Sequence, residues 1–228
     1  MPSIITINQS NPYYPSRLLD LADAPKEIYG LGHLEALNKL GLAIVGSRKA
    51  SQLGLKQSFR FAQELSARGL CIISGLATGI DTAAHYGALS SGIALPTIAI
   101  CGAGLDTCYP KHNQALFNEI AQKGLLLSEY PLGTPIKPFH FPKRNRLIAA
   151  LSIGTLIVEA TVKSGSLISA KQAANLGREV FAIPRSIEEK GGEGCHYLIK
   201  NGAKLTENID DILDEFMPYP GIQRAKAV

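Results

Sequence analysis

The sequence predicts an α/β fold in which a doubly wound, mostly parallel sheet of the extended Rossmann-like type carries helices on both faces. Three observations lead to this class. Short apolar segments recur along the chain, these segments are continuous rather than alternating with polar residues, and helical segments ending in glycine separate several of them. Continuous apolar strands are typical of parallel sheets, because both faces of such sheets are buried. Alternation of strands and helices predicts βαβ units, and hence parallel pairing.

The apolar segments and the stretches between them define the expected elements. Strands are predicted at 42–45, 70–73, 97–100, 125–128, 155–158 and 180–183. Helices are predicted at 51–69, 112–124 and 166–177, each ending in a glycine, the residue that commonly follows a helix C-terminus. A further helix is expected to begin near Asp81, and the segment 129–151 is interpreted as a long loop.

The same elements define the expected domain organisation. Residues 1–40 carry turn signals and short helical pieces, and they are expected to pack on the core as an N-terminal extension. Residues 41–215 are expected to form the Rossmann-like domain. After the sixth strand this domain continues as a loop, a short helix, a turn and a last helix. Residues 216–228 are interpreted as a tail or a truncated linker.

Composition narrows the class of protein. The chain has 228 residues, of which 46% are hydrophobic and 18% charged, so it is long enough to bury a real core. No stretch is apolar over the ~18 residues that would indicate a membrane span. The N-terminus lacks a basic segment followed by an apolar one, so we expect a cytoplasmic protein with no membrane partner. A formal net charge of +4 is compatible with a polyanionic partner, but also with many ordinary enzymes.

The four cysteines give no sign of a metal or redox centre. They are Cys71, Cys101, Cys108 and Cys195, and no two of them form a Cys-x-x-Cys pair. Buried reduced thiols therefore explain them better than a metal or disulfide site does. We expect neither a metal nor a cofactor.

Residues that follow the predicted strands carry the candidate chemistry, because ligands of doubly wound sheets bind beyond the carboxyl ends of the strands. Gly46, Ser47 and Arg48 follow the first strand and lead toward a helix, an arrangement in which backbone amides and a guanidinium favour an anion. The dinucleotide fingerprint Gly-x-Gly-x-x-Gly does not fit this stretch, so NAD is not favoured.

A second set of anion-binding groups follows the fifth strand. These residues are Lys163, Ser164, Gly165 and Ser166, at the expected start of a helix. They offer a cation, hydroxyl groups and backbone amides to an anion. A capping role for Ser166 explains part of this pattern without any ligand.

The segment 129–151 holds the densest cluster of cations and aromatic rings. Its cations are Lys137, Lys143, Arg144 and Arg146, and its rings are Phe139, His140 and Phe141. Cations that bind phosphates, interleaved with rings that stack on bases, are typical of a groove for single-stranded nucleic acid. The alternative is that both phenylalanines are buried under the loop and the cations are merely solvated.

Asp81 and His85 lie four residues apart, on one face of the helix expected there. This spacing leaves an acid–base pair open as an interpretation. The simpler interpretation is that Asp81 or Thr82 caps the helix and that His85 is structural.

Six motifs in a fixed order resemble the DNA-processing protein A (DprA/Smf) family. They read AIVGSRKAS, SGLATGIDTAAHYGAL, CGAGLDTCYP, LLSEYPLGTPIKPFHFPKRNRLIAALS, VEATVKSGSLISAKQAANLGREVFAIP and EGCHYLIKNGAKL. The resemblance covers about residues 10–215. It implies an extended Rossmann-like domain that binds and protects single-stranded DNA, forms a homodimer and loads the recombinase RecA during natural transformation. Many members carry a C-terminal winged-helix module and a helical N-terminal domain, both of which this sequence is expected to lack.

The resemblance also implies site residues, position by position. The family's phosphate site falls on Gly46, Ser47 and Arg48, with Arg48 holding a DNA phosphate and neighbouring amides completing the anion site. Its stacking and basic loop falls on Phe141, Arg144, Asn145 and Arg146, with Lys137 nearby, and its Ser-Gly-Ser turn on Ser164, Gly165 and Ser166.

The expected function is binding without catalysis, because the sequence shows neither the carboxylate cluster of a two-metal nuclease nor a Walker lysine. The alternative is a nucleotide-processing enzyme of the lonely-guy phosphoribohydrolase type, which has a similar sheet. Such an enzyme would carry Pro-Gly-Gly-x-Gly-Thr-x-x-Glu after the fifth strand, where this chain has EATVKSGSLISA, and only Glu159 keeps that idea open. A nucleotide-sensing regulator is a third interpretation, and it predicts tight mononucleotide binding.

Overall fold

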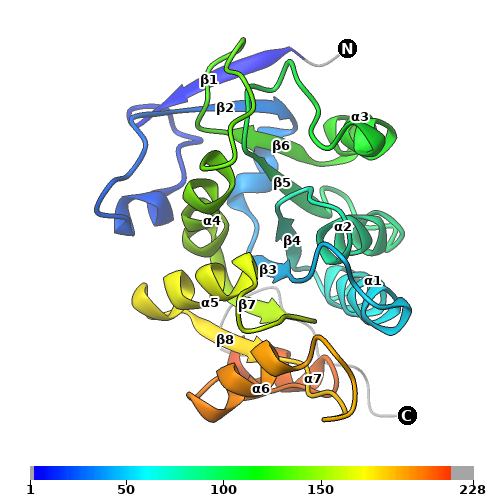
Figure 1. Cartoon of the computed structure of the whole chain (residues 1–228). Helices are drawn as coiled ribbons and strands as arrows, with labels where there is room; N and C mark the ends of the chain where they lie inside the picture. Colours follow the sequence, from blue (N-terminus) through cyan, green and yellow to red (C-terminus); the bar gives the residue numbers. More distant parts are fainter. Residues whose placement is uncertain (1–2, 217–228) are drawn as a thin grey trace.

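The computed structural model describes residues 3–216. Within that range the strands form one nine-stranded sheet, whose arrangement is seen in Figure 1. The strands are β1 (Ile4–Asn8), β2 (Glu27–Gly32), β3 (Gly41–Val45), β4 (Cys71–Ser74), β5 (Thr97–Cys101), β6 (Leu125–Ser128), β7 (Ser152–Ile157), β8 (Glu179–Ala182) and β9 (Lys204–Leu205). Their order across the sheet is β1-β2-β6-β5-β4-β3-β7-β8-β9. β2 pairs antiparallel with β1 and with β6, and the other neighbours are parallel.

Helices fill the connections between these strands. The α-helices of the described residues are α1 (Gln52–Ala67), α2 (Ile80–Leu89), α3 (Gln114–Lys123), α4 (His140–Leu151), α5 (Gly165–Asn175), α6 (Glu193–Lys200) and α7 (Asp210–Phe216). Short 3-10 helices are η1 (Ser16–Asp20), η2 (Leu34–Asn38) and η3 (Lys111–Asn113). No helix within residues 3–216 has the length and apolar character needed to cross a membrane.

The predicted fold class is confirmed, and each of the six predicted strands overlaps an observed one. The chain leaves the central strand β3 toward β4, β5 and β6, and later continues on the other side of β3 with β7, β8 and β9. The boundary between β3 and β7 is therefore the place where the strand order reverses. In open α/β sheets, ligands bind beyond the carboxyl ends of the strands at such a point. In Figure 1 these carboxyl ends face the viewer.

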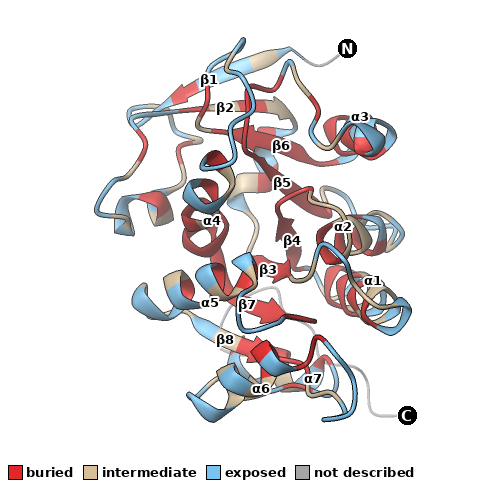
Figure 2. Ribbon diagram, viewed as in Figure 1, coloured by how far each residue is buried: buried red, intermediate tan, exposed pale blue. Residues whose placement is uncertain are grey.

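Helices cover both faces of the sheet, because successive residues of each buried strand point to opposite sides. In β3, Leu42 and Ile44 join the core that lies under α1, α2 and α7, whereas Ala43 and Val45 join the core under α4 and α5. A third cluster joins β5 and β6 to α3. Figure 2 shows the result, with buried central strands between helices whose outer surfaces are exposed.

The segment 129–151 differs from its interpretation as a loop, because residues from His140 onward form α4. Leu147, Ile148 and Leu151 give this helix an apolar face, which is buried against the sheet. Pro142 lies in the first turn, where proline is tolerated because the amide there needs no intrahelical partner. The prolines and cations at the start of the segment had concealed a helix.

The N-terminal residues extend the sheet. β1 pairs with β2, β2 pairs with β6, and Leu18 of η1 is buried in the core on the α4 side. These two strands are absent from the sequence-based expectation, because polar residues and glycines interrupt them and they lack the continuous apolar runs of the parallel strands. At the other end, Phe216 closes α7 and is buried, with its ring centroid 5.7 Å from that of Phe181. The remaining residues of the expected tail, 217–228, lie outside the described residues.

The cysteines are buried, as the sequence led us to expect, and each is a free thiol. Burial raises the pKa of the Cys71 and Cys101 thiols to about 12. Such thiols stay protonated at neutral pH and are poor nucleophiles and poor metal ligands.

Candidate nucleic-acid interface

A groove of about 1050 Å³ lies beyond the carboxyl ends of β3 and β7, at the reversal of strand order. We call it the switch-point groove. It brings together most of the residues predicted from the sequence, namely Gly46, Ser47, Arg48, Phe141, Arg144, Asn145, Ser164, Gly165 and Ser166. Lys137, Lys163 and Arg146 are not among its lining residues. The groove also includes residues that sequence reasoning missed, above all Tyr109 and Lys190.

The Gly-Ser-Arg turn after β3 is held rigidly from below. A Cβ at Gly46 would lie 2.7 Å from Ile80 Cγ1 and 2.8 Å from the Glu159 carbonyl oxygen, so only glycine fits this position without movement. The Ser47 amide donates a 2.8 Å hydrogen bond to that same carbonyl oxygen. Arg48 itself is exposed to solvent. The turn therefore presents one cationic side chain from a fixed backbone.

The amides around this turn differ from the expectation that they complete an anion site. The Lys49 amide donates to Ser47 Oγ, and the Ser51 amide donates to both carboxylate oxygens of Glu159 at 3.1 Å. The anion at the start of α1 is thus the protein's own Glu159, which lies where the helix dipole stabilises negative charge. The Ser47, Lys49 and Ser51 amides thus have partners within the protein, and the exposed Arg48 side chain is available to a phosphate.

Arg48, Phe141 and Tyr109 pack together as a cluster in the groove. The Arg48 guanidinium carbon lies 5.5 Å from the centroid of the Phe141 ring, and the ring centroids of Phe141 and Tyr109 are 5.1 Å apart at an angle of 36°. A Cβ at Gly102 would lie 2.9 Å from Phe141 Cδ1, so this glycine makes room for the ring. Tyr109 is 44% exposed. The cluster offers aromatic surface for stacking and a cation beside it.

The sequence contains a signal from which Tyr109 could have been predicted. It closes the CGAGLDTCYP motif, which begins at the carboxyl end of a predicted strand and therefore in the same crevice as Gly46. Lys190 had no such signal, because its loop enters the groove only through the fold.

Arg144 lines the groove, but its guanidinium donates hydrogen bonds to carbonyl groups inside the protein. Its Nη1 donates to the carbonyl oxygen of Gly75 at 2.6 Å and also to that of Ile100, and its residue is 3% exposed. Burial lowers the pKa of Arg144, while the neighbouring Asp81 carboxylate opposes this shift. Arg144 thus joins the ends of β4 and β5 beneath the groove.

Arg146 lies on the other side of α4, because two residues along a helix correspond to a rotation of about 200°. Its Nη2 donates to Glu129 Oε2 at 2.7 Å and its Nε to Asp23 Oδ2 at 2.8 Å. This places Arg146 between the end of β6 and the N-terminal segment, away from Arg48 and Phe141. The short distance in sequence between Arg144 and Arg146 had suggested a common role for them. The helix instead directs the two side chains to different parts of the molecule.

The Ser164–Ser166 turn opens α5 toward the groove. The N-cap is Ser164 and not the expected Ser166: Ser164 Oγ accepts from the Ser166 amide at 3.3 Å and lies 2.6 Å from Ser166 Oγ. Asn145 Nδ2 donates to the Gly165 carbonyl oxygen at 3.4 Å and links this turn to α4.

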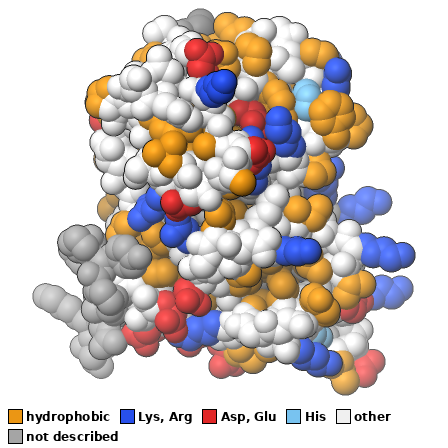
Figure 3. Space-filling view, turned by 90° about the vertical axis from the view of Figure 1, so that its left-hand side faces the viewer, with side chains coloured by type: hydrophobic (Ala, Val, Ile, Leu, Met, Phe, Trp, Pro, Cys, Tyr) orange, Lys and Arg blue, Asp and Glu red, His pale blue; other side chains and the backbone are white. Residues whose placement is uncertain are grey.

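Exposed lysines lie around the rim. Lys137 Nζ is 5.8 Å from the ring centroid of the exposed Phe139, and Lys163 is exposed next to the Ser-Gly-Ser turn. In Figure 3, Lys and Arg side chains project along the right-hand edge, which corresponds to the front of Figure 1. The carboxyl-end side of the molecule is thus rich in cations.

Glu159, the residue that kept the hydrolase alternative open, is fully engaged by protein groups. Its Oε2 accepts hydrogen bonds from Ser51 Oγ and from Arg185 Nη1, each at 2.7 Å. Both of its oxygens also accept from the Ser51 amide, and the residue is 3% exposed. Its visible role is to join the end of β7 to the start of α1.

Asp81 and His85 each have another partner. Asp81 Oδ2 accepts from the Gly75 amide at 3.1 Å, and burial raises the pKa of Asp81 to about 6 although Arg144 opposes the shift. His85 Nδ1 lies 2.7 Å from Thr97 Oγ1, and burial lowers the pKa of His85 to about 3. His85 is neutral at physiological pH and enclosed in the core, which fits the structural interpretation.

Comparison with known proteins places the chain in a family. Residues 4–217 match the sequence model of DNA recombination-mediator protein A. DNA processing protein DprA of Streptococcus pneumoniae is 47% identical over 203 residues, which are 89% of this chain and 71% of that protein. Protein Smf of Escherichia coli is 43% identical over 215 residues, which are 93% of this chain and 57% of that protein.

Two solved structures agree with this placement. The crystal structure of the S. pneumoniae DprA matches with a TM-score of 0.89 and 44% identity, over 93% of this chain and 74% of that one. A structure of DNA processing protein A from Helicobacter pylori, described by its single-stranded DNA binding mode, matches with a TM-score of 0.85 and 32% identity, over 96% of this chain and 99% of that one. Because the family match spans nearly all of the sequence and the resemblance seen in its motifs is confirmed, the chain belongs to the DNA recombination-mediator protein A (DprA/Smf) family.

Proposed function

We propose that this chain binds single-stranded DNA in the switch-point groove with little sequence preference. The observation that carries the proposal is the cluster of Arg48, Phe141 and Tyr109, in which an exposed cation lies over the Phe141 ring and that ring packs against Tyr109. Every base has a flat face that stacks on such rings, and every nucleotide has a phosphate that pairs with such a cation, so the cluster suits any sequence. The structural match to the H. pylori protein supports the proposal, because that protein is described as binding single-stranded DNA.

Each groove residue takes a role that fits its surroundings. Arg48 holds a phosphate through its guanidinium, which is planar and donates two parallel hydrogen bonds. Phe141 and Tyr109 stack on bases. The start of α5, with Ser164, Gly165 and Ser166, receives a further phosphate, since the helix dipole there favours negative charge.

The remaining predicted residues divide into three groups. Lys137 and Lys163 attract the strand from the rim, together with Lys190. Gly46, Ser47, Arg144 and Asn145 shape and support the groove. Arg146 keeps α4 attached to β6 through Glu129, and we assign it no contact with DNA.

Beyond binding, we propose that the chain protects incoming single strands and loads RecA onto them as a cytoplasmic homodimer, without catalysing a reaction. Membership of the recombination-mediator family supports this role. The engagement of Glu159 by Ser51 and Arg185 argues against the hydrolase alternative, because a catalytic carboxylate needs a free oxygen. The chain spans 57% of the E. coli relative and 71% of the S. pneumoniae one, so these activities of whole relatives are proposals for it.

The decisive experiment is fluorescence anisotropy with labelled oligonucleotides of increasing length, single-stranded and double-stranded, over a range of salt concentrations. We expect affinity to grow with the length of a single strand, and its logarithm to fall with the logarithm of salt concentration by about 0.7 for each neutralised phosphate. Equal affinity for a mononucleotide and a long oligomer would instead favour a nucleotide sensor. RecA loading is tested separately, by following RecA filament assembly on single-stranded DNA with and without the chain.

A further inference from the structure

A second groove lies beside the switch-point groove, on the outer surface of α1, α2 and α3. We call it the α1–α2 groove, and its volume is about 1040 Å³. Its apolar floor includes Leu55 and Phe59 of α1 and Tyr86 and Leu89 of α2. Phe59 is 36% exposed and Tyr86 is 41% exposed, so both rings are accessible to a ligand.

The two helices that carry these rings pack closely against each other. A Cβ at Gly87 would lie 2.2 Å from the Phe59 carbonyl oxygen and 3.0 Å from Ala62 Cβ, so α1 and α2 touch at this level. Tyr86 precedes the contact glycine on α2, and Phe59 is the contact residue on α1. Their rings therefore belong to one site on two fixed helices, whereas an exposed ring on a loop would have no defined position.

The charges around the α1–α2 groove favour a polyanion. Its cations are Arg48, Lys49, Lys56 and Lys123. Among the described lining residues the carboxylate is Glu119, and its Oε1 already lies 2.8 Å from Lys123 Nζ. Exposed rings beside unmatched cations suit a chain of phosphates and bases better than they suit an apolar peptide.

The two grooves meet at the Gly-Ser-Arg turn. Arg48 and Lys49 line both of them. Gly79, at the start of α2, has a φ of +81° and brings α2 so close to the Gly-Ser-Arg turn that a Cβ there would lie 2.3 Å from the Ser47 carbonyl oxygen. The turn and the head of α2 are therefore in direct contact, and Arg48 and Lys49 lie where the two grooves meet. From there α2 runs for 10 residues, or about 15 Å.

We propose that a single strand of DNA leaving the switch-point groove passes Arg48 and continues along the α1–α2 groove. Its bases stack on Phe59 and Tyr86, and its phosphates face Lys49 and Lys56. This inference rests on the proposed function, since it extends the path of the same strand. It predicts that a long oligomer gains affinity from contacts that a short one cannot reach.

The test compares two lengths of labelled oligothymidine, about 5 and about 20 nucleotides, in anisotropy titrations. The double variant Phe59→Ala/Tyr86→Ala should bind the long oligomer about fivefold or more weakly than the unmodified chain, and the short one unchanged, because stacking on a ring is lost only for bases beyond Arg48. Lys56→Glu should weaken binding of the long oligomer in the same way.

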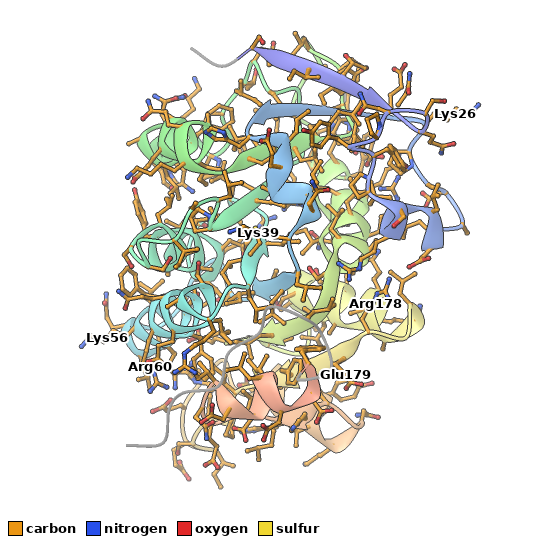
Figure 4. All side chains as sticks on the ribbon, turned by 180° about the vertical axis from the view of Figure 1, so that it is seen from behind. Lys26, Lys39, Lys56, Arg60, Arg178 and Glu179 are labelled. Atoms are coloured by element: carbon orange, nitrogen blue, oxygen red, sulfur yellow. The ribbon has the colours of Figure 1, made fainter. Side chains whose placement is uncertain are left out.

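Arg60→Glu provides the matched control for Lys56→Glu. Both side chains project from α1 in Figure 4, but Arg60 is not among the residues that line the groove. Thermal melting of every variant confirms that it folds, and Lys56→Glu keeps the test decisive even if loss of two rings disturbs α1.

Three outcomes would overturn the inference. The first is wild-type affinity of both groove variants for the long oligomer, which leaves the proposed function intact as long as the unmodified chain binds DNA. The second is an equal loss of affinity for both oligomer lengths, which would mean that these residues act in the switch-point groove or stabilise the fold. The third is unchanged DNA binding together with an altered oligomeric state, which assigns the groove to a second copy of the chain. Absence of binding by the unmodified chain would remove the proposed function itself.

Discussion

Replacing Arg146 with alanine should destabilise the protein and leave DNA binding unchanged. The reason lies in the unequal surroundings of its two partners. The side chains of Arg146 and Glu129 are only 9% and 7% exposed, whereas the Asp23 side chain is 63% exposed. The contact with Asp23 is screened by water and contributes at most about 1 kcal/mol. Removal of one member of a buried pair leaves the other charge without compensation and costs about 3–5 kcal/mol.

A second cation reduces this loss. Lys143 Nζ lies 3.9 Å from Glu129 Oε2 and still faces the carboxylate after the substitution. We therefore expect the lower end of the range, about 3 kcal/mol in the free energy of unfolding.

Urea denaturation gives the free energy of unfolding, and anisotropy with a long oligomer gives the affinity at a temperature well below the melting transition. The double variant Arg146→Ala/Glu129→Gln is the control, because it removes both charges and should recover part of the lost stability. A variant Arg146→Ala that unfolds like the unmodified chain but binds DNA more weakly would refute the assignment. That result would return Arg146 to the DNA-contacting set.

Three further predictions concern the groove and the residues beneath it. Arg48→Ala should weaken oligonucleotide binding and lower the salt slope by about 0.7, with little change in melting temperature. Arg48→Lys should restore only part of the affinity, because a lysine offers a point charge in place of a planar guanidinium that donates two hydrogen bonds. A sharp fall in the melting temperature of Arg48→Ala at unchanged affinity would contradict this role. Phe141→Ala should weaken binding by about 1–3 kcal/mol and leave the salt slope unchanged, because stacking releases no counterions; melting of the same sample would reveal a core role instead. The pKa of Asp81 is raised from 3.8 to about 6 in the fold, so the folded state binds the proton more tightly and the contribution of Asp81 to stability grows as pH falls from about 6 to about 4. The unfolding free energy of the unmodified chain minus that of Asp81→Asn should therefore rise as pH falls from about 6 to about 4. A difference that stays constant with pH would contradict the raised pKa.

The strands of the parallel sheet follow from the sequence alone. Each is a short continuous run of apolar residues, and such a run is stable only where both of its faces are covered. The helices that end in glycine follow for a similar local reason. Once the strands are known, their carboxyl ends are known too, and this is why the sequence suffices to assign Gly46, Arg48 and Ser164 to one crevice.

Contacts between distant segments depended on the fold. Tyr109 meets Phe141 because the turn after β5 and the start of α4 converge at one edge of the sheet. Glu159 takes the anion position at the start of α1, more than 100 residues away along the chain. No local pattern of the sequence reports such a partner, because hydrogen bonds of this kind form only when two strand ends become neighbours.

The two arginines of α4 show the physical limit of sequence reasoning most clearly. Composition predicts that a segment rich in Arg, Lys and Phe binds nucleic acid, since charge and aromatic character belong to the residues themselves. The direction in which each side chain points belongs to the helix, and the helix was concealed by Pro142 and the cations around it. Once α4 forms, its rotation turns Arg144 toward the ends of β4 and β5 and Arg146 toward Glu129. The sequence by itself therefore determined which chemical groups this protein has near its sheet edge, and the tertiary structure alone decided which of them remain free to meet a ligand.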